Sequence, residues 1–195
     1  EEGGVTVDGI THRTPDPFIC IATQNPLSSA GTQKLTDSQL YRFMVRLSMG
    51  YPDLESQVDI IRQRQGRNPV DTVRPLAGAS HIRTMKQVAE HVKIKDEVIM
   101  YAAKLCEATR SAEAVEQGAS PRAVLALVQM AKASALMDGR DHVIPQDISS
   151  VFIDVCAHRL VLTARARIRK ETEADVLKKI LSDVKPPAVA EGKAE

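Results

Sequence analysis

A short string in the second half of the chain combines the signals of a helix start with a positive charge. In Gly118-Ala119-Ser120-Pro121-Arg122, Ser120 is a residue type that caps helices and Pro121 suits the first helical position. Arg122 then falls in the first turn, where the helix dipole disfavours a cation and favours an anion. We therefore predict that Arg122 and the helix N-terminus bind a phosphate group together. The alternative is an arginine that lies back over the preceding loop.

Polar residues also follow an apolar run near the start of the chain. Residues 18–23 are continuously apolar up to Thr23, which is typical of a strand buried on both faces of a mostly parallel sheet. Gln24 and Asn25 come next, at the carboxyl end of the strand, where α/β sheets bind ligands. We therefore regard Asn25 as a candidate ligand contact. The alternative is that Asn25 only turns the chain before Pro26.

Arg42 lies on a predicted helix, on the side opposite its apolar residues. Thr36 and Gln39 fit a capping box, and apolar residues at helical spacing continue from there to Leu47. Taken alone, Arg42 is interpreted as an arginine on the solvated face of this helix.

The other polar residues form no recognisable site. His81, His91 and His158 fall on separate predicted helices without the spacing of metal ligands. The stretch 159–170 includes five basic residues, but an acidic stretch at 171–175 follows at once. The basic residues are Arg159, Arg165, Arg167, Arg169 and Lys170. A solvated helix face is therefore favoured over a nucleic-acid site.

Composition and charge exclude several classes of protein. The 195 residues are 43% hydrophobic and 26% charged, which excludes collagen-like and broadly disordered chains. A net charge of +1 lacks the excess typical of nucleic-acid binding, and no apolar stretch is long enough to span a membrane. The three cysteines, Cys20, Cys106 and Cys156, form no CxxC pair. We expect buried, reduced thiols in a cytoplasmic protein rather than a disulfide framework or a zinc site.

The predicted elements divide the chain into an α/β part and an all-α part. Residues 5–12 predict a hairpin that turns at Asp8-Gly9. The character changes after Gly50-Tyr51-Pro52. We predict an incomplete α/β core over 1–52, a helical bundle over 53–185 and a disordered tail over 186–195. The helices of the bundle are expected at about 53–65, 80–92, 95–109, 121–137, 146–161 and 172–184.

Several strings along the chain closely resemble the MoxR family of AAA+ ATPases. The most specific are ATQNP at 22–26 and GASPRA at 118–123, and GYP at 50–52 and HRL at 158–160 follow the same pattern. The resemblance covers about residues 5–185 in unbroken order. It implies a partial AAA+ α/β core followed by a helical lid.

The resemblance implies a role for each candidate residue. Asn25 matches the sensor 1 residue, which helps position the attacking water near the γ-phosphate. Arg42 matches the arginine finger, which reaches the nucleotide of the neighbouring subunit. Arg122 matches sensor 2, a lid arginine that contacts phosphate, and the hairpin at 5–12 resembles the pre-sensor 1 insertion. The chain departs from the family at Tyr41, where an acidic residue is usual, which leaves the local support of the finger helix open.

The phosphate loop of the family is absent from the sequence. No G-x-x-x-x-G-K-[ST] string occurs, and no apolar strand ends in a pair of carboxylates that could hold magnesium. We therefore expect the chain to be the C-terminal part of an ATPase and to be inactive alone. ATP and Mg²⁺ are expected as cofactors of the full-length parent, with none bound to this fragment.

The resemblance also implies partners. It predicts a homo-oligomeric ring, expected to be a hexamer, that acts on protein clients, with von Willebrand factor A domain proteins as one class. Two alternatives remain open. One is a catalytically silent interaction module built on the lid, and the other is a related AAA+ protein that acts on nucleic acid or in metal chelation.

Overall fold

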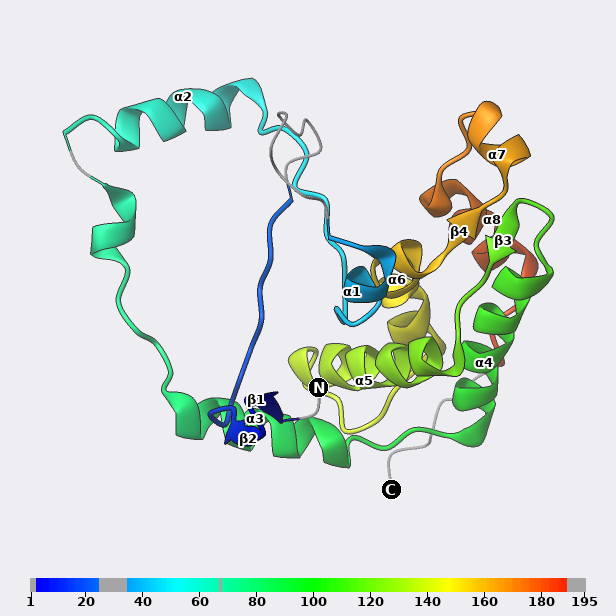
Figure 1. The fold of residues 1–195 in the computed structure, drawn as a ribbon, viewed down its shortest axis with the longest axis horizontal. Helices are drawn as coiled ribbons and strands as arrows, with labels where there is room; N and C mark the ends of the chain where they lie inside the picture. Colours follow the sequence, from blue (N-terminus) through cyan, green and yellow to red (C-terminus); the bar gives the residue numbers. More distant parts are fainter. Residues whose placement is uncertain (1–2, 25–34, 67, 189–195) are drawn as a thin grey trace.

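The computed structural model describes residues 3–24, 35–66 and 68–188, and its fold is mixed α/β but mostly helical, as predicted (Figure 1). The α-helices and 3₁₀ helices (η) of the described residues are α1 (Asp37–Leu40), α2 (Leu54–Gln63), η1 (Pro69–Thr72), α3 (Ala79–His91), α4 (Asp96–Ser111), α5 (Pro121–Met137), α6 (Pro145–Cys156), η2 (Ala157–Arg159), α7 (Ala164–Ile168) and α8 (Glu173–Asp183). The strands are β1 (Gly4–Val7), β2 (Ile10–Arg13), β3 (Val115–Gln117) and β4 (Val161–Leu162).

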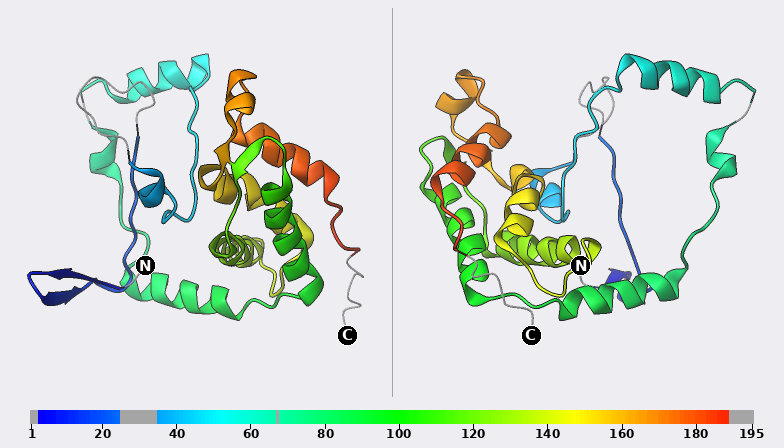
Figure 2. Two further views of the ribbon diagram at one scale, coloured as in Figure 1. Left: turned by 45° about the vertical axis from the view of Figure 1, so that its right-hand side comes forward. Right: turned by 180° about the vertical axis from the view of Figure 1, so that it is seen from behind.

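The predicted hairpin is formed by β1 and β2. The strands are antiparallel, and the pair Val7 and Ile10 flanks the turn. Asp8 and Gly9 take φ angles of 50° and 78° there, which is the left-handed region that an Asp-Gly pair tolerates. The hairpin is exposed and lies beside the start of α3, away from the helical bundle (Figure 2).

The predicted buried strand at 18–23 is not formed. The segment carries no strand hydrogen bonds, and its apolar side chains are exposed, with Ile21 at 87%. A strand needs a neighbour to pair its backbone groups, and each sheet of the described residues contains only two strands, neither from this segment. Cys20 lies here and is exposed, which contradicts the expectation that all three thiols are buried.

The helix predicted from Thr36 to Leu47 begins as expected but is shorter. Thr36 and Gln39 make the capping box: the Gln39 amide donates to Thr36 Oγ1 and the Thr36 amide donates to Gln39 Oε1. Helix α1 ends at Leu40, and residues 41–44 continue as turns. Over residues 41–46, contacts with the helical bundle take the place of the predicted helix.

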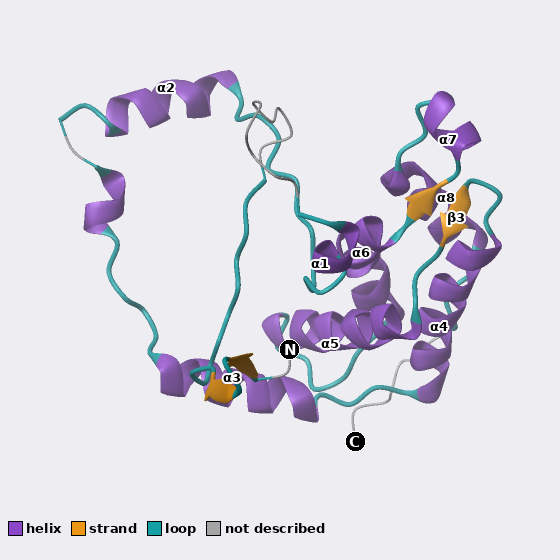
Figure 3. Ribbon diagram, in the orientation of Figure 1, coloured by secondary structure: helices purple, strands orange, loops and turns teal. Residues whose placement is uncertain are grey.

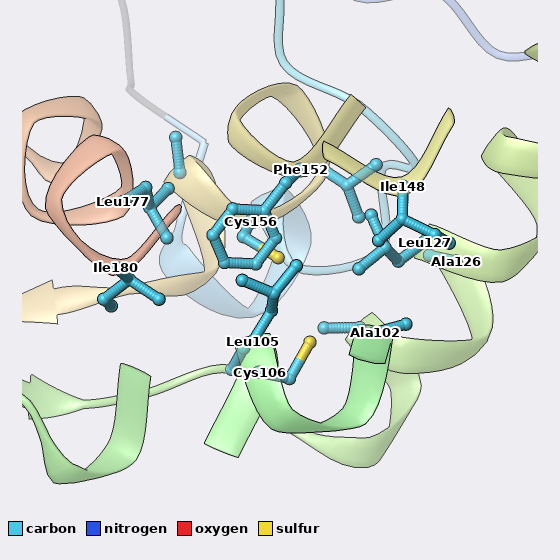
Figure 4. Close-up of a cluster of buried hydrophobic side chains, with 14 of the residues drawn as sticks. Ala102, Leu105, Cys106, Ala126, Leu127, Ile148, Phe152, Cys156, Leu177 and Ile180 are labelled. Carbon is cyan, nitrogen blue, oxygen red and sulfur yellow. The ribbon is translucent and has the colours of Figure 1, made fainter. Parts of the chain in front are cut away.

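The hydrophobic core lies between α4, α5, α6 and α8 (Figures 3 and 4). Leu105 of α4, Leu127 of α5 and Phe152 of α6 are fully buried at its centre. Cys106 and Cys156 also lie in this core, close enough for Cys106, together with burial, to raise the pKa of the Cys156 thiol. All the buried apolar residues fall between Val92 and Ile180, so this part of the described chain provides the packed scaffold.

The region after residue 53 is not entirely helical. The helix predicted over 146–161 ends at Cys156, and η2 and β4 follow it. After η2 the chain returns to the end of α4, where β4 pairs antiparallel with β3. The remaining predicted helices are found within one or two residues of their expected ends. Residues 186–188 of the predicted tail lack regular structure, and the rest of the tail lies outside the described residues.

Helices α2 and α3 lie apart from the bundle for most of their length and bury no residue (Figure 1). The end of α3 reaches α5, where Lys132 Nζ donates to the Glu90 carbonyl at 2.9 Å. Among the described residues, no helix combines the length and the apolar character needed to cross a bilayer.

Candidate functional site

Arg42 and Arg122, the two arginines singled out from the sequence, line the same pocket. The pocket has a volume of about 540 Å³ and lies between the end of α1, the start of α5 and the η2–β4 segment. Both side chains belong to exposed residues at its wall. Although the residues are far apart in the sequence, the fold brings two guanidinium groups to one cavity. The lining residues are Asp37, Ser38, Tyr41, Arg42, Gln117, Ser120, Arg122, His158, Arg159, Leu160 and Val161.

The start of α5 is built as the sequence indicates. Ser120 is the N-cap residue, Pro121 occupies the first turn and Arg122 follows it. The Ser120 side chain makes no capping hydrogen bond, and its Oγ atom is buried without a partner among the described residues. The N-terminus of a helix bears the positive end of its dipole. In α5, Pro121 has no amide hydrogen and the Ala123 amide donates to the Ser120 carbonyl at 2.9 Å. This end of α5 therefore brings the positive end of the dipole and the cationic Arg122 to the pocket.

The loop before α5 is fixed to the last turn of α4. Thr109 Oγ1 donates to the Cys106 carbonyl at 2.6 Å and accepts from the Ala119 amide at 2.8 Å. Arg110 Nε donates to the Ala119 carbonyl at 2.7 Å. Gly118 permits this approach, because a Cβ atom there would lie 2.7 Å from the Arg110 backbone nitrogen. The end of α4 thus sets the direction in which α5 begins.

Tyr41 connects the turn that carries Arg42 to the start of α5. Its phenol oxygen accepts a hydrogen bond from the Ser120 amide at 3.2 Å. The Arg159 guanidinium lies 5.9 Å from the centre of its ring, within the range of a cation–π contact. The residue that departs from the family pattern therefore has defined contacts on both sides.

His158 and Arg159 are the residues that sequence reasoning missed. Arg159 was assigned to a solvated basic face, but it is only 5% exposed, so this prediction is wrong. Its Nη2 atom and His158 Nε2 each lie 2.9 Å from the Phe43 carbonyl, which accepts from both. Arg159 Nη1 also donates to the Met44 carbonyl at 3.2 Å. The basic residues that follow, such as Arg165 at 70% side-chain exposure, do lie at the surface as predicted.

Burial governs the ionisation of this pair. Burial has the largest effect on the pKa of His158 and lowers it, and the nearby positive charges of Arg159 and Arg46 lower this pKa further. A neutral imidazole that donates from Nε2 to the Phe43 carbonyl fits this environment. Burial likewise lowers the pKa of the Arg159 guanidinium.

The remaining candidates are Asn25 and the two residues before it. Asn25 lies outside the described residues, so its predicted role stays a prediction. Thr23 and Gln24 are exposed, have no regular structure and do not line the pocket. In the part of the chain that the structure describes, no group of His, Cys, Asp and Glu side chains could hold a metal ion.

Two family models match the chain. Residues 1–45 match the ATPase family associated with various cellular activities (AAA), and residues 107–180 match the AAA lid domain. The pocket described above has walls from both regions, since Arg42 belongs to the first and Arg122 to the second.

Relatives and a solved structure agree with these matches. YeaC of Bacillus subtilis, an uncharacterized protein, is 35% identical over 187 residues, which are 96% of this chain and 58% of YeaC. The chaperone MoxR1 of Mycobacterium tuberculosis is 34% identical over 198 residues, which are 97% of this chain and 52% of MoxR1. The chain thus spans between half and three-fifths of the length of these relatives.

A crystal structure of a proposed ATPase from Cytophaga hutchinsonii superposes with a TM-score of 0.87 at 29% identity, and the match covers 96% of this chain and 59% of that one. Its fold, the two family models and the relatives agree with the ATQNP and GASPRA strings of the sequence. The chain therefore belongs to the MoxR-type AAA+ ATPases, with a mixed α/β part followed by a helical lid.

Proposed function

We propose that this chain forms part of a ring-shaped ATPase that couples ATP hydrolysis to the remodelling or maturation of partner proteins. Residues 1–52 would belong to the ATPase core and 53–185 to the lid. The observation that carries the proposal is the pocket shared by Arg42, Arg122 and the start of α5. Guanidinium groups and the positive end of a helix dipole both stabilise phosphate oxygens.

In this proposal, the two arginines contact different phosphates. Arg122 would bind a phosphate at the N-terminus of α5, where the Ser120 hydroxyl would add a donor. Arg42 would act as an arginine finger on a neighbouring subunit, where it stabilises the charge that develops during phosphoryl transfer. Asn25 would orient the attacking water. A finger that acts between subunits needs a head-to-tail interface, and such interfaces close into rings.

The residues present fit the phosphate part of a nucleotide. ATP would supply the phosphoryl group, and the phosphate loop would come from residues other than these 195, since the sequence contains no such string. Magnesium would likewise be held elsewhere, because the described residues offer no cluster of metal ligands. On its own, the chain is then expected not to hydrolyse ATP.

We also propose partners and a location for the whole ATPase. MoxR1 is named a chaperone, which supports protein clients, and von Willebrand factor A domain proteins are the class we propose. We propose a hexameric ring in the cytoplasm. The nearly balanced charge favours protein clients over nucleic acid.

The proposal is tested by steady-state ATP hydrolysis of the ATPase that contains this chain together with a phosphate loop. Wild-type and Arg42→Ala subunits are mixed in varying ratios while nucleotide binding is followed with a fluorescent ATP analogue. We expect Arg42→Ala to remove turnover but to leave nucleotide binding largely intact. Activity should also fall more steeply than the mutant fraction, since each missing finger silences a neighbouring site and, in a ring whose subunits work in turn, also slows the sites that follow. Normal turnover of Arg42→Ala would contradict the role of Arg42.

The alternative function is a catalytically silent module that uses the lid as a binding surface. A segment before these 195 residues that lacked a phosphate loop would favour it. A complete protein without any ATP turnover would support this alternative and would contradict the proposed ATPase.

A further inference from the structure

The turn that carries Arg42 is attached to the lid by its backbone. The Phe43 carbonyl accepts hydrogen bonds from His158 Nε2 and Arg159 Nη2, both at 2.9 Å. The Met44 carbonyl accepts from Arg159 Nη1 at 3.2 Å. Each of these donors lies more than a hundred residues further along the chain, in η2.

Further contacts hold the same turn on its C-terminal side. The Arg46 amide donates to the Asp154 carbonyl of α6 at 2.9 Å, and the Arg46 side chain lies 3.8 Å from Glu173 of α8. Val45 packs against the hydrophobic core. By contrast, helix α1 on the N-terminal side contains no buried residue. The position of Arg42 is therefore set by α6, η2 and α8 more than by the helix that precedes it.

The burial of the Arg159 guanidinium destabilises the fold, so this residue is expected to make contacts that an apolar side chain could not make. Arg159 makes no ion pair among the described residues, and its Nε atom is buried without a hydrogen-bond partner there. A buried cation without a carboxylate is destabilising relative to a well-packed apolar residue. Its terminal nitrogens donate hydrogen bonds to the carbonyls of Phe43 and Met44 and to that of Val155 at the end of α6. A guanidinium is suited to this task, because its donors form a rigid planar fork.

We propose that His158 and Arg159 are positioning residues that hold the Phe43 and Met44 carbonyls and thereby fix Arg42 for phosphoryl transfer in the neighbouring subunit. The inference rests on the proposed function, in which Arg42 is a finger. A displacement of about 1 Å at a catalytic group costs on the order of 100-fold in rate. Loss of either donor thus lowers turnover by shifting Arg42 from its place.

The first measurement is kcat and KM for ATP in the complete ATPase. We expect Arg159→Met to lower kcat about 10- to 100-fold and to leave KM within about twofold, since the finger acts only in the transition state. His158→Leu should lower kcat less, because Arg159 still binds the Phe43 carbonyl. His158→Gln keeps a hydrogen-bond donor, so its kcat should lie closer to the wild-type value than that of His158→Leu. Arg165→Met is the matched control: this exposed arginine pairs with Glu113 at the surface, and its loss should leave kcat unchanged.

The second measurement separates a misplaced finger from a damaged lid. Arg159→Met subunits are mixed with subunits whose phosphate loop is disabled but whose Arg42 is intact. The disabled subunits supply a correctly placed finger to the active sites of their neighbours. We expect turnover to recover, as it should for Arg42→Ala subunits in the same mixture. A defect in the subunit's own nucleotide site or in its folding would not recover in this way.

Each outcome decides between the two proposals. Recovery of both variants supports the positioning role. Recovery of Arg42→Ala without recovery of Arg159→Met overturns the positioning role and leaves the proposed function standing. Unchanged turnover of Arg42→Ala, or no recovery of that variant, contradicts the proposed function itself. If circular dichroism shows that Arg159→Met is unfolded, the same mixtures made with Arg159→Lys and His158→Leu decide.

Discussion

Asp147 joins the start of α6 to the turn after α5, and its removal tests how much one buried carboxylate stabilises the helical bundle. Its two oxygens accept from Arg140 Nη1 and Nη2 at 2.7 and 2.6 Å, and the Ile144 amide adds a third bond at 2.8 Å. Asp147 is 3% exposed. Burial alone would raise the pKa of this carboxyl, but Arg140 and the Ile144 amide outweigh it and hold the pKa below its usual value.

We expect Asp147→Ala to lower the free energy of unfolding by about 3 kcal/mol. Removing one partner of a fully buried ion pair costs roughly 3–5 kcal/mol. The lower end applies here, because the Arg140 side chain is 24% exposed and keeps a bond to Asp138 at 2.9 Å. Asp147→Asn should cost less, about 1–2 kcal/mol, since an amide oxygen in the place of Oδ2 still accepts from Arg140 Nη1 and the Ile144 amide.

The assay is urea denaturation of the 195-residue chain at pH 7, followed by far-ultraviolet circular dichroism. Asp138→Ala is the matched control: its carboxylate binds the same Arg140 but is 65% exposed, so its loss should cost less than about 1 kcal/mol. Equal effects of the two alanine variants, or a cost below about 1 kcal/mol for Asp147→Ala, would refute the reasoning.

The same carboxylate predicts a dependence on pH. Its pKa is lower in the folded chain than in the unfolded chain, where it is about 3.9. Its contribution is therefore fully present above about pH 5 and is lost as the pH falls through the folded value. The difference in stability between wild type and Asp147→Ala should shrink when the pH is lowered from about 5 to about 3. A constant difference over this range would contradict the assignment.

Three further substitutions test the scaffold of the pocket, each by urea denaturation of the chain. Gly118→Ala should destabilise by about 1–3 kcal/mol, because the new Cβ meets the α4 backbone at 2.7 Å, whereas the Cβ of Gly78→Ala meets only His81 Nδ1, at an ordinary contact distance of 4.0 Å, and causes no clash. Leu105→Ala should cost about 2–5 kcal/mol by leaving a cavity in the core. Tyr41→Phe should cost about 1 kcal/mol, because the Ser120 amide loses its acceptor. Wild-type stability of any of these three variants would contradict the corresponding contact.

The sequence predicts those parts of the fold that short-range signals determine. The Asp8-Gly9 turn and the Ser120-Pro121 helix start are found where they were expected, because a turn or a helix cap depends on a few neighbouring residues. The strand expected at 18–23 is not formed, because its stability depends on partner strands and not on its own apolar side chains.

The candidate site could be predicted only in part. Helix-start signals identified Arg122, and resemblance to a family identified Arg42, but no spacing shows that both line one pocket. Arg159 was misjudged because it stands next to exposed basic residues along the chain, while its burial is decided by a turn more than a hundred residues earlier. Such long-range contacts leave no periodic signal in a single sequence.

The hydrogen bonds from η2 to the turn after α1 determine which mutations this turn tolerates. His158 and Arg159 bind carbonyl oxygens, which every residue type carries, so the side chains at Phe43 and Met44 are open to replacement without loss of these bonds. An inserted or deleted residue between Arg42 and Phe43 would instead leave the Phe43 and Met44 carbonyls bound to η2 and would move Arg42 relative to them. The segment should therefore accept substitutions at these two positions far more readily than any change in its length.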